Sequence, residues 1–340
     1  MEVLEHVAMR DHTTLRLGGE ARFFVSVSNV PELREALDFA REKKVPYYVI
    51  GGGSNVFFAD ENWNGLVIHM KLAGREYEEG NKGDAKVTVA AGEVWDQFVE
   101  ETVSLGYWGI ENLSRIPGTV GAAPVQNIGA YGSEVSELID WVEVLNARTN
   151  ELHILSASEC KFGYRDSIFK HKEGKDYIIT RVSFRFTTQP RPRLEYKDLY
   201  EYFGSRKDVS VVEVRNAINE IRAKKFPPLT KVGTAGSFFK NPIVSKQLVV
   251  EMEKWLDAPV PHHEVDEFSV KVPAGWILER LGWKGKREGC VGCWDNHALL
   301  LVHYGDGTAE EFLNFVEQIK EDVKAKTTIV LESEVRIVGG

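Results

Sequence analysis

Hydrophobic residues in the first third of the chain recur with two different periods, which predict strands and one helix. Residues 21–27 alternate as a strand does, and the apolar positions of residues 33–40 recur at helical spacing after a candidate cap at Ser28 or Asn29. Two short apolar runs, residues 45–50 and residues 66–70, predict further strands.

The middle of the chain mixes the same two periods without regular alternation of strand and helix. Residues 87–91 predict a strand, and Trp95, Phe98 and Val99 mark the buried face of a helix that ends at Gly106. Three more strands are expected at residues 141–145, 151–155 and 177–186, the first two as a hairpin around a polar turn. This pattern indicates an α+β fold.

The last third is set apart by a helix that ends at Lys225, just before Pro227 and Pro228. Beyond it the periodicity predicts helices over 247–256 and 273–281, a strand over 298–303, and a helix opened by the capping box Thr308 and Glu311. A final strand over 328–338 would bury Ile329, Leu331, Val335 and Ile337 and place Glu332, Glu334 and Arg336 on its other face.

Composition narrows the class of protein. With 340 residues, 43% of them hydrophobic, the chain can bury substantial cores and form two or three domains. The three cysteines argue against a disulfide framework, and the net charge of −9 disfavours nonspecific binding to nucleic acid or acidic membranes. We find neither a signal-peptide pattern at the amino terminus nor an apolar run of about 20 residues. We therefore expect a cytoplasmic protein, with no nucleic-acid or membrane partner.

The segment from Ile116 to Gly132 is the strongest candidate binding element. Its seventeen residues include four glycines and two prolines and carry no charge. Glycine lets backbone amides approach a ligand closely, and successive amides can form a concave anion site. We interpret the segment as a cradle for a large cofactor; a tight structural turn is the alternative.

The loop Gly51-Gly-Gly-Ser-Asn55 follows an apolar run but does not match a dinucleotide fingerprint. Val56 stands where the third glycine is required, and a further strand rather than a helix follows. The loop can still surround a phosphate with backbone amides, with Ser54 and Asn55 as additional donors.

Two charged residues are candidates for the chemistry. Arg165, in the aromatic and charged stretch 160–170, can bind a carboxylate in two-point geometry; a surface turn with a local pair to Asp166 is the alternative. Glu334, which shares a strand face with Arg336, can act as a polariser or proton relay if that face lines a cleft; otherwise the face is simply solvated.

Ser237 follows a glycine in an apolar loop, without the Gly-x-Ser-x-Gly pattern of a hydrolase. Its hydroxyl can donate a proton if Lys240 or Lys225 stabilises the alkoxide, although serine after glycine is most often a turn. Cys290 and Cys293 lack the further ligands of a zinc site, so we assign them a structural role and expect no metal.

Together these stretches resemble the UDP-N-acetylenolpyruvoylglucosamine reductase family. The resemblance rests on the cradle, Phe162-Gly-Tyr-Arg-Asp-Ser167, Gly236-Ser-Phe-Phe-Lys-Asn-Pro242 and Leu331-Glu-Ser-Glu-Val-Arg336. It implies an FAD-binding fold of the vanillyl-alcohol oxidase type in two subdomains, residues 1–72 and 73–225, and a substrate-binding domain over 226–327. It also implies that residues 328–340 return to the active-site region as a C-terminal strand.

The resemblance implies an NADPH-dependent reduction of UDP-N-acetylglucosamine enolpyruvate to UDP-N-acetylmuramate through noncovalent FAD. Arg165 and Glu334 would stabilise an enol-like intermediate, and Ser237 would protonate it. Substrate would be bound by Tyr164, Tyr196, Lys225, Asn241 and His297. FAD would be bound by Gly51, Gly52, Gly53, Ser54, Asn55, Ile116, Pro117, Gly118, Gly121, Ala122, Ala123, Gln126, Asn127, Gly129, Ala130, Tyr131 and Arg336.

Two other functions fit the sequence. A flavin oxidase of the same fold would act on another small substrate, often with covalently bound flavin, and a noncatalytic UDP-sugar binding protein would lack flavin. For the reductase we expect a monomer.

Overall fold

The computed structural model describes residues 1–80 and 83–339. The chain divides into two compact units that interleave along the sequence. The first comprises Met1–Val7, Ala21–Gly52 and Asn64–Arg222, and the second comprises Ala8–Glu20, Gly53–Trp63 and Ala223–Gly340. The four-part division expected from the sequence remains a prediction.

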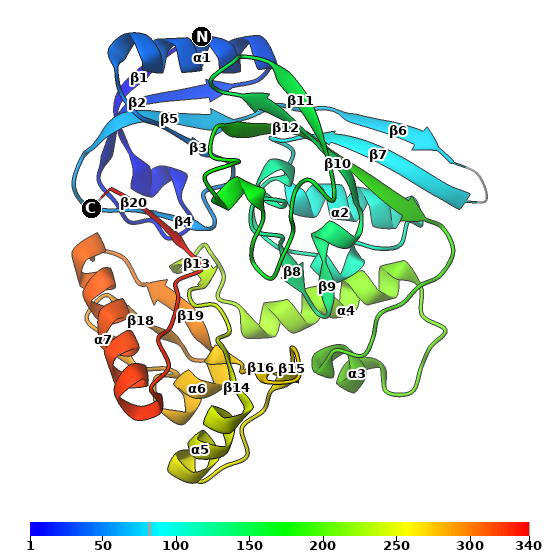
Figure 1. Ribbon diagram of the computed structural model, residues 1–340, viewed down its shortest axis with the longest axis vertical. Coiled ribbons are helices and arrows are strands. Elements are labelled where there is room, and N and C mark those ends of the chain that lie inside the picture. The colour runs from blue at the N-terminus through cyan, green and yellow to red at the C-terminus, as the bar shows by residue number, and fades with distance from the viewer. Residues whose placement is uncertain (81–82, 340) are drawn as a thin grey trace. The chain divides into compact units, whose positions relative to one another are not determined.

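The first unit opens with a four-stranded sheet in the order β1-β2-β5-β3, covered by one helix, α1 (Figure 1). Asn29 caps this helix by accepting a hydrogen bond from the Glu32 amide at 2.9 Å, so one of the two candidate caps is confirmed. The elements are β1 (Leu4–Ala8), β2 (Glu20–Val27), α1 (Val30–Lys43), β3 (Tyr47–Ile50) and β5 (Trp63–Met70).

The same unit contains an antiparallel five-stranded sheet in the order β11-β10-β12-β7-β6. Trp95 and Phe98 of helix α2 pack against Phe184 of β12, with ring centroids 6.1 and 5.2 Å from the Phe184 ring. The elements are β6 (Arg75–Glu79), β7 (Asp84–Ala90), α2 (Trp95–Ser104), β10 (Ile139–Asn146), β11 (Leu152–Ser156) and β12 (Tyr177–Thr187).

Short elements and two helices complete the first unit. A hairpin of two two-residue strands, β8 and β9, lies within and just after the cradle. The elements are η3 (Glu111–Leu113), η4 (Val120–Ala122), β8 (Gly129–Ala130), β9 (Ser133–Glu134), η5 (Val135–Glu137), η6 (Ile168–Lys170), α3 (Lys197–Phe203) and α4 (Val211–Lys225).

The second unit has its own core around the fully buried Phe57, Phe238 and Phe312. Its sheets have the orders β13-β19-β18-β17 and β14-β16-β15, and β20 pairs with β4 in parallel. The elements are η1 (Met9–His12), β4 (Val56–Phe58), β13 (Gly233–Ser237), β14 (Ile243–Ser245), α5 (Lys246–Leu256), β15 (His263–Glu264), β16 (Ser269–Lys271), α6 (Ala274–Arg280), β17 (Arg287–Glu288), β18 (Val291–Trp294), β19 (His297–His303), α7 (Ala309–Thr327) and β20 (Arg336–Val338).

The expected strand over 328–338 is wrong for most of its length, because only Arg336–Val338 is a strand. The segment changes partner: the Glu334 amide donates to the Phe238 carbonyl, and the Arg336 amide donates to the Asn55 carbonyl. No single ladder therefore runs along it. Ile329, Leu331 and Val335 are buried as expected, but Ile337 is 42% exposed.

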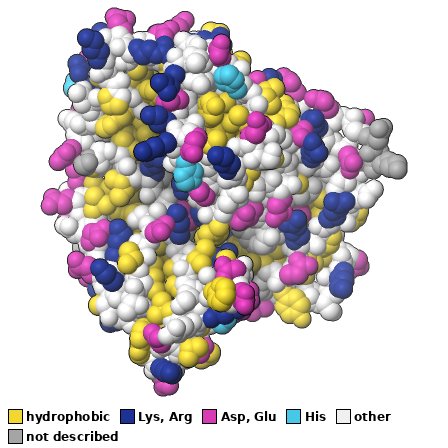
Figure 2. All heavy atoms as spheres, in the orientation of Figure 1, with side chains coloured by type: hydrophobic (Ala, Val, Ile, Leu, Met, Phe, Trp, Pro, Cys, Tyr) yellow, Lys and Arg dark blue, Asp and Glu magenta, His cyan; other side chains and the backbone are white. Residues whose placement is uncertain are grey.

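Within the described ranges 1–80 and 83–339, no helix has the length and apolar character needed to cross a membrane. On the face shown in Figure 2, basic and acidic side chains are interspersed.

Candidate active site

Two glycine-containing segments meet in the first unit. A Cβ added at Gly51 would lie 2.2 Å from the Thr119 Oγ1 atom, and one added at Gly52 would lie 3.0 Å from the Gly118 Cα atom. The Thr119 side chain leaves no room for a Cβ at Gly51, and Gly52 lies where its backbone closely approaches that of Gly118. The structure thus brings together two segments that the sequence analysis assigned to the cofactor.

The first half of the cradle lies antiparallel to the residues that lead into α2. The Trp95 amide donates to the Gly118 carbonyl at 3.1 Å, and the Val120 amide donates to the Glu93 carbonyl at 2.9 Å. A Cβ at Gly121 would lie 2.5 Å from the Ala91 Cβ. This half of the cradle is therefore held by backbone hydrogen bonds and by close packing.

Side chains hold the second half. Asn127, which is 1% exposed and has a φ of 46°, donates from Nδ2 to the Glu134 carboxylate at 2.8 Å and to the Gly163 carbonyl at 3.0 Å. The Ser167 hydroxyl donates to the Val125 carbonyl at 2.6 Å. These contacts fix a backbone that has little regular secondary structure of its own.

Arg165 lies against the cradle. Its guanidinium donates to the Gly129 carbonyl at 2.8 Å and to the Asn127 carbonyl at 3.4 Å, and its Cζ lies 5.7 Å from the centre of the Tyr164 ring. The turn expected as an alternative is also present, but the Asp166 carboxylate contacts His171 Nε2 at 2.8 Å. Two predicted site residues, Arg165 and Tyr164, thus lie at the predicted cradle.

Tyr131 connects the end of the cradle to another predicted site residue. Its ring lies 5.3 Å from that of Tyr196, edge to face, and Asn112 Nδ2 donates to its carbonyl at 2.9 Å. Burial raises the pKa of the Tyr131 phenol to about 12, although the nearby Arg222 guanidinium acts in the opposite direction.

In the second unit, Ser237 and Glu334 lie on neighbouring stretches of backbone. The Glu334 amide donates to the carbonyl of Phe238, the residue after Ser237, at 2.8 Å. Ser237 follows Gly236, whose φ of 81° re-aims the chain at the end of β13. Two of the three predicted catalytic residues are therefore neighbours, although they are 97 positions apart in the sequence.

The end of the loop 51–55 belongs to the same region of the second unit. Gly53 has a φ of 61°, and a Cβ there would lie 2.0 Å from the His12 carbonyl oxygen. Asn55 Nδ2 donates to the Glu334 carbonyl at 3.3 Å, and the Arg336 amide donates to the Asn55 carbonyl at 3.1 Å. Asn55, Glu334 and Arg336 are thus brought together.

The other predicted substrate residues of the second unit are partly buried. Asn241 Oδ1 accepts from the Ala274 amide at the start of α6 at 3.0 Å. His297 Nδ1 accepts from the Leu299 amide at 3.3 Å, and its ring lies 6.1 Å from that of Phe226, the residue after Lys225. The Lys240 ammonium, a candidate neighbour of Ser237, forms an ion pair with Glu332 at 3.0 Å.

The predicted site residues are thus divided between the units. The first holds Gly51, Gly52, the cradle, Arg165, Tyr164 and Tyr196, and the second holds Gly53, Ser54, Asn55, Lys225, Ser237, Asn241, His297, Glu334 and Arg336. The convergence of Arg165 with Ser237 and Glu334 remains a prediction.

Sequence reasoning missed several residues that contact the cradle or the chain leading into it, directly or through one other residue: Asp96, Asn112, Ser167, Arg215 and Arg222. One signal was available for the last two. They are seven positions apart in α4 and bracket Ile218, so they share the face of a helix whose apolar residues point inward. Arginines on such a face need a polar partner, since burying an unpaired charge is costly.

The residues present fit FAD. Where Gly52 approaches the Gly118 backbone, both segments consist of main chain without side chains, as a diphosphate group requires, and the Thr119 hydroxyl lies beside Gly51. Arg165 adds a positive charge beside the cradle.

Two family models match the chain. One, described as an FAD binding domain, matches residues 21–155. The other, described as the C-terminal domain of UDP-N-acetylenolpyruvoylglucosamine reductase, matches residues 227–338. The first model includes the cradle, and the second includes Ser237 and Glu334.

Similar proteins extend the match to nearly the whole chain. A UDP-N-acetylenolpyruvoylglucosamine reductase from Pseudomonas putida is 37% identical over 332 residues, which is 97% of each chain. One from Bacteroides fragilis is 38% identical over 335 residues, 97% of this chain and 98% of its relative. The crystal structure of the Thermus caldophilus reductase superimposes with a TM-score of 0.69 at 26% identity, covering all of both chains.

These matches confirm the α+β class, the FAD-binding fold and the flavin-dependent reductase class predicted from the sequence. The chain belongs to the UDP-N-acetylenolpyruvoylglucosamine reductase family.

Proposed function

We propose that the chain reduces UDP-N-acetylglucosamine enolpyruvate to UDP-N-acetylmuramate, with NADPH as the hydride donor. The observation that carries the proposal is the match at 37–38% identity over nearly its full length to reductases of this name. The local structure supports it, because Arg165 lies at the cradle and Ser237 lies beside Glu334.

Residues 51–55 and the cradle would hold FAD, together with Arg336, whose amide donates to the Asn55 carbonyl. When bound, FAD would supply the hydride-transfer chemistry that links NADPH to the β-carbon of the enolpyruvyl group. The protein then has two tasks: to stabilise the negative charge that grows on the α-carbon and carboxylate, and to supply a proton.

We assign charge stabilisation to Arg165. Two backbone carbonyls accept hydrogen bonds from its guanidinium, which fixes the plane of the cation before substrate arrives. A preorganised cation stabilises developing charge without reorganising during the reaction. The planar guanidinium also matches the geometry of a carboxylate.

We assign proton donation to Ser237 and a supporting electrostatic role to Glu334. The left-handed turn at Gly236 and the hydrogen bond between the Phe238 carbonyl and the Glu334 amide keep the two residues adjacent. A hydroxyl held in this way can deliver its proton to the α-carbon from a fixed position.

Substrate binding is assigned to Tyr164, Tyr196, Lys225, Asn241 and His297, with Tyr196 covering the nucleotide part. Tyr196 is 45% exposed while its ring contacts Tyr131 of the cradle. It can therefore contact a ligand while it packs against the cofactor-binding segment. This contact gives a physical route by which substrate binding and the cradle influence each other.

UDP-sugars and NADPH are cytoplasmic metabolites, so we place the protein in the cytoplasm, where the product serves peptidoglycan synthesis. We propose that it acts as a monomer, which light scattering of the purified protein would test.

An anaerobic absorption experiment tests the function. The purified protein should show the flavin band, NADPH should bleach it, and UDP-N-acetylglucosamine enolpyruvate should restore it in the absence of oxygen. Recovery with oxygen but not with this substrate would instead identify a flavin oxidase. Protein that binds UDP-sugar without any flavin band would identify a noncatalytic binding protein.

A further inference from the structure

We propose that one face of helix α4 clamps both ends of the FAD-binding cradle, and that Arg215 is a positioning residue that sets FAD affinity without touching FAD. The α4 clamp consists of Arg215, Asn219 and Arg222. The inference rests on the FAD binding included in the proposed function and adds residues to which the family resemblance gave no role.

The three residues lie on one face of α4, since positions four and seven apart return to the same side of a helix. Arg215 is 7% exposed and Arg222 is 8% exposed. Arginine is almost never buried to this extent unless it is paired. The two arginines on this face are therefore held by protein partners rather than by solvent.

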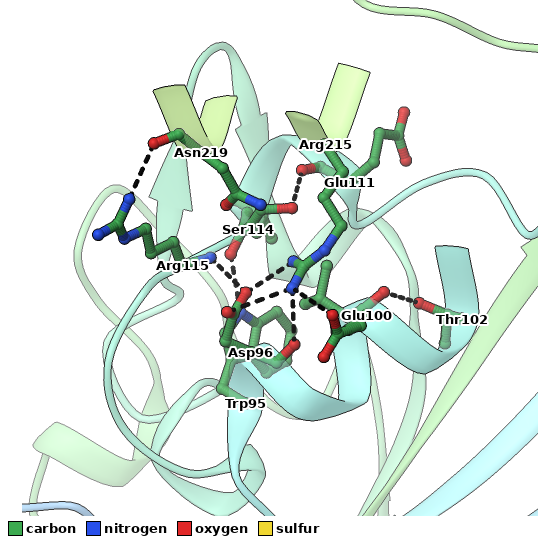
Figure 3. A network of polar contacts seen from close by, with 11 residues as sticks. Trp95, Asp96, Glu100, Thr102, Glu111, Ser114, Arg115, Arg215 and Asn219 are labelled. Atoms are coloured by element: carbon green, nitrogen blue, oxygen red, sulfur yellow. Dashed lines mark hydrogen bonds and ion pairs between the residues drawn. The ribbon is translucent and has the colours of Figure 1, made fainter. Parts of the chain in front are cut away.

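Arg215 reaches the first turn of α2 (Figure 3). Its NH1 donates to Asp96 Oδ1 at 2.7 Å, and its NH2 lies 3.3 Å from Oδ2 of the same carboxylate. The Asp96 carboxylate also accepts a hydrogen bond from the backbone amide of Arg115. Arg215 thus holds the carboxylate that anchors the residue immediately before the cradle.

Arg115, the residue before the cradle, has a strained backbone conformation. Its φ of 60° is a left-handed conformation that costs a residue with a side chain about 1–2 kcal/mol. Its amide is held by Asp96, and its guanidinium donates to the Asn219 carbonyl at 2.9 Å (Figure 3). Both contacts of Arg115 depend on α4. Arg215 orients the Asp96 carboxylate, and the Asn219 carbonyl accepts the hydrogen bond from the Arg115 guanidinium.

The far end of the cradle repeats the arrangement. Tyr131 has a φ of 49°, again left-handed in a residue with a side chain, and its phenol oxygen accepts a hydrogen bond from the Arg222 guanidinium. The two ends of the glycine-rich segment are therefore both strained, and both are tied to the same helix face seven residues apart. A single rigid helix then fixes the separation of the ends.

The expected consequence is a change in FAD affinity. Without the clamp, the strained entry and exit of the cradle can relax, and FAD must then restore their conformation when it binds. Removing a residue that orients a metal ligand typically costs about 10-fold to 100-fold in metal affinity, and Arg215 orients the cradle in a comparable, indirect way. We expect a loss of this size for Arg215→Gln.

The test compares flavin retention in full-length holoprotein. Flavin fluorescence rises on release, so serial dilution followed by ultrafiltration gives the dissociation constant. Arg215→Gln and Asp96→Asn should each raise it about 10-fold to 100-fold, and the double variant should be no worse than the poorer single variant, since the two residues act as one unit. Activity lost on dilution should return when FAD is added back.

Two further variants keep the inference falsifiable. Arg115→Ala removes the contact to Asn219 from an exposed side chain, so it should fold and still weaken flavin binding. Arg181→Gln is the matched control, because it breaks an ion pair to the buried Glu143 in the same unit, on the sheet strands β12 and β10. It should lower the urea midpoint and leave flavin retention unchanged.

Unchanged flavin retention in Arg215→Gln and Arg115→Ala would overturn the clamp. Equal loss of flavin in Arg181→Gln would also overturn it, by showing that general destabilisation is the cause. If the wild-type protein binds no FAD, the proposed function itself fails, and the two failures are thereby distinguished.

Discussion

At the scale of single residues, Arg165 shows how the fold prepares a cation for chemistry. Its own φ is 52°, and the Lys170 ammonium donates to its carbonyl at 2.9 Å, so backbone and side chain are both fixed. Replacing Arg165 with lysine keeps the charge but loses the planar guanidinium, which can donate to two backbone carbonyls and to the substrate carboxylate at the same time.

We expect Arg165→Lys to lower turnover by about 100-fold. Reduction of the flavin by NADPH should change much less, because it does not require charge on the enolpyruvyl carboxylate to be stabilised. Steady-state and rapid-mixing kinetics would measure the two effects. Turnover equal to that of the wild type would remove Arg165 from this role.

Ser237→Ala should separate the two half-reactions. Flavin reduction by NADPH should remain nearly intact, and reoxidation by the enolpyruvyl substrate should slow by about 100-fold or more, since a positioned proton donor is lost. Stopped-flow absorbance measures both. Ser245→Ala is a control, because that hydroxyl caps α5, and it should alter neither step. Equal slowing of both steps in Ser237→Ala would argue against the proton-donor role.

Glu111 gives a prediction for pH. It is 2% exposed, and burial raises the pKa of its carboxyl above the usual value. The folded state therefore holds this proton to higher pH than the unfolded state does. The resulting stability is complete below the unfolded pKa and is lost as pH rises through the folded pKa.

Glu111→Gln cannot ionise, and its amide oxygen can still accept from the Gly109 amide as the Glu111 carboxylate does. The stability of the variant relative to the wild type should therefore increase as pH rises from the usual pKa of a glutamate carboxyl through the raised pKa of Glu111 in the folded state. Urea unfolding at several pH values measures this. A difference that stays constant across the range would contradict it.

At the scale of elements, the cradle depends on the glycine loop beside it. Gly52→Ala would place a Cβ 3.0 Å from the Gly118 Cα, so one of the two backbones must move. Overpacking of this kind typically costs about 1–3 kcal/mol. We expect less flavin per protein after gel filtration, together with a lower urea midpoint.

Gly163→Ala is the matched control in the same unit, because the nearest atom to its added Cβ is 3.8 Å away. It should retain flavin. Loss of flavin from this variant as well would show that the position of the glycine is not what matters.

The sequence predicted well those elements whose secondary structure is determined by their own residues. Helix α7 begins at the expected capping box, where Thr308 and Glu311 satisfy each other's backbone amides, and its apolar face is buried as expected. The β10–β11 hairpin is likewise confirmed. In such elements the local signal and the tertiary packing agree.

Elements fixed by distant partners were not predictable in the same way. Strand β6 is mostly charged and lies at a sheet edge, so its ladder to β7 rather than its composition makes it a strand. The final segment alternates as a strand would, yet it changes partner between Glu334 and Arg336. For the same reason the sequence indicated Arg165 and the cradle separately, while the hydrogen bonds that join them are visible only in the structure.

At the scale of the whole molecule, the chain enters the second unit three times. Leu15 and Leu17 come from the first visit and Phe57 from the second, and all three are buried in the core that also contains Phe312. The Phe57 and Phe312 rings are 5.7 Å apart, and β4 is the parallel partner of β20. The core of the second unit is thus built from segments that a linear division of the sequence separates.

A fragment that begins at Ala223 and runs to the end of the chain should therefore not fold as the second unit does in the full protein. It lacks three buried apolar side chains, each of which contributes about 1.5–3 kcal/mol, out of a typical total stability of about 5–15 kcal/mol. It also leaves the β20 edge without its partner β4. We expect broad, poorly cooperative urea unfolding and strong binding of a hydrophobic dye. A sharp transition without dye binding would show that residues 8–20 and 53–63 are dispensable for this core, and that the interleaving of the chain is not what stabilises it.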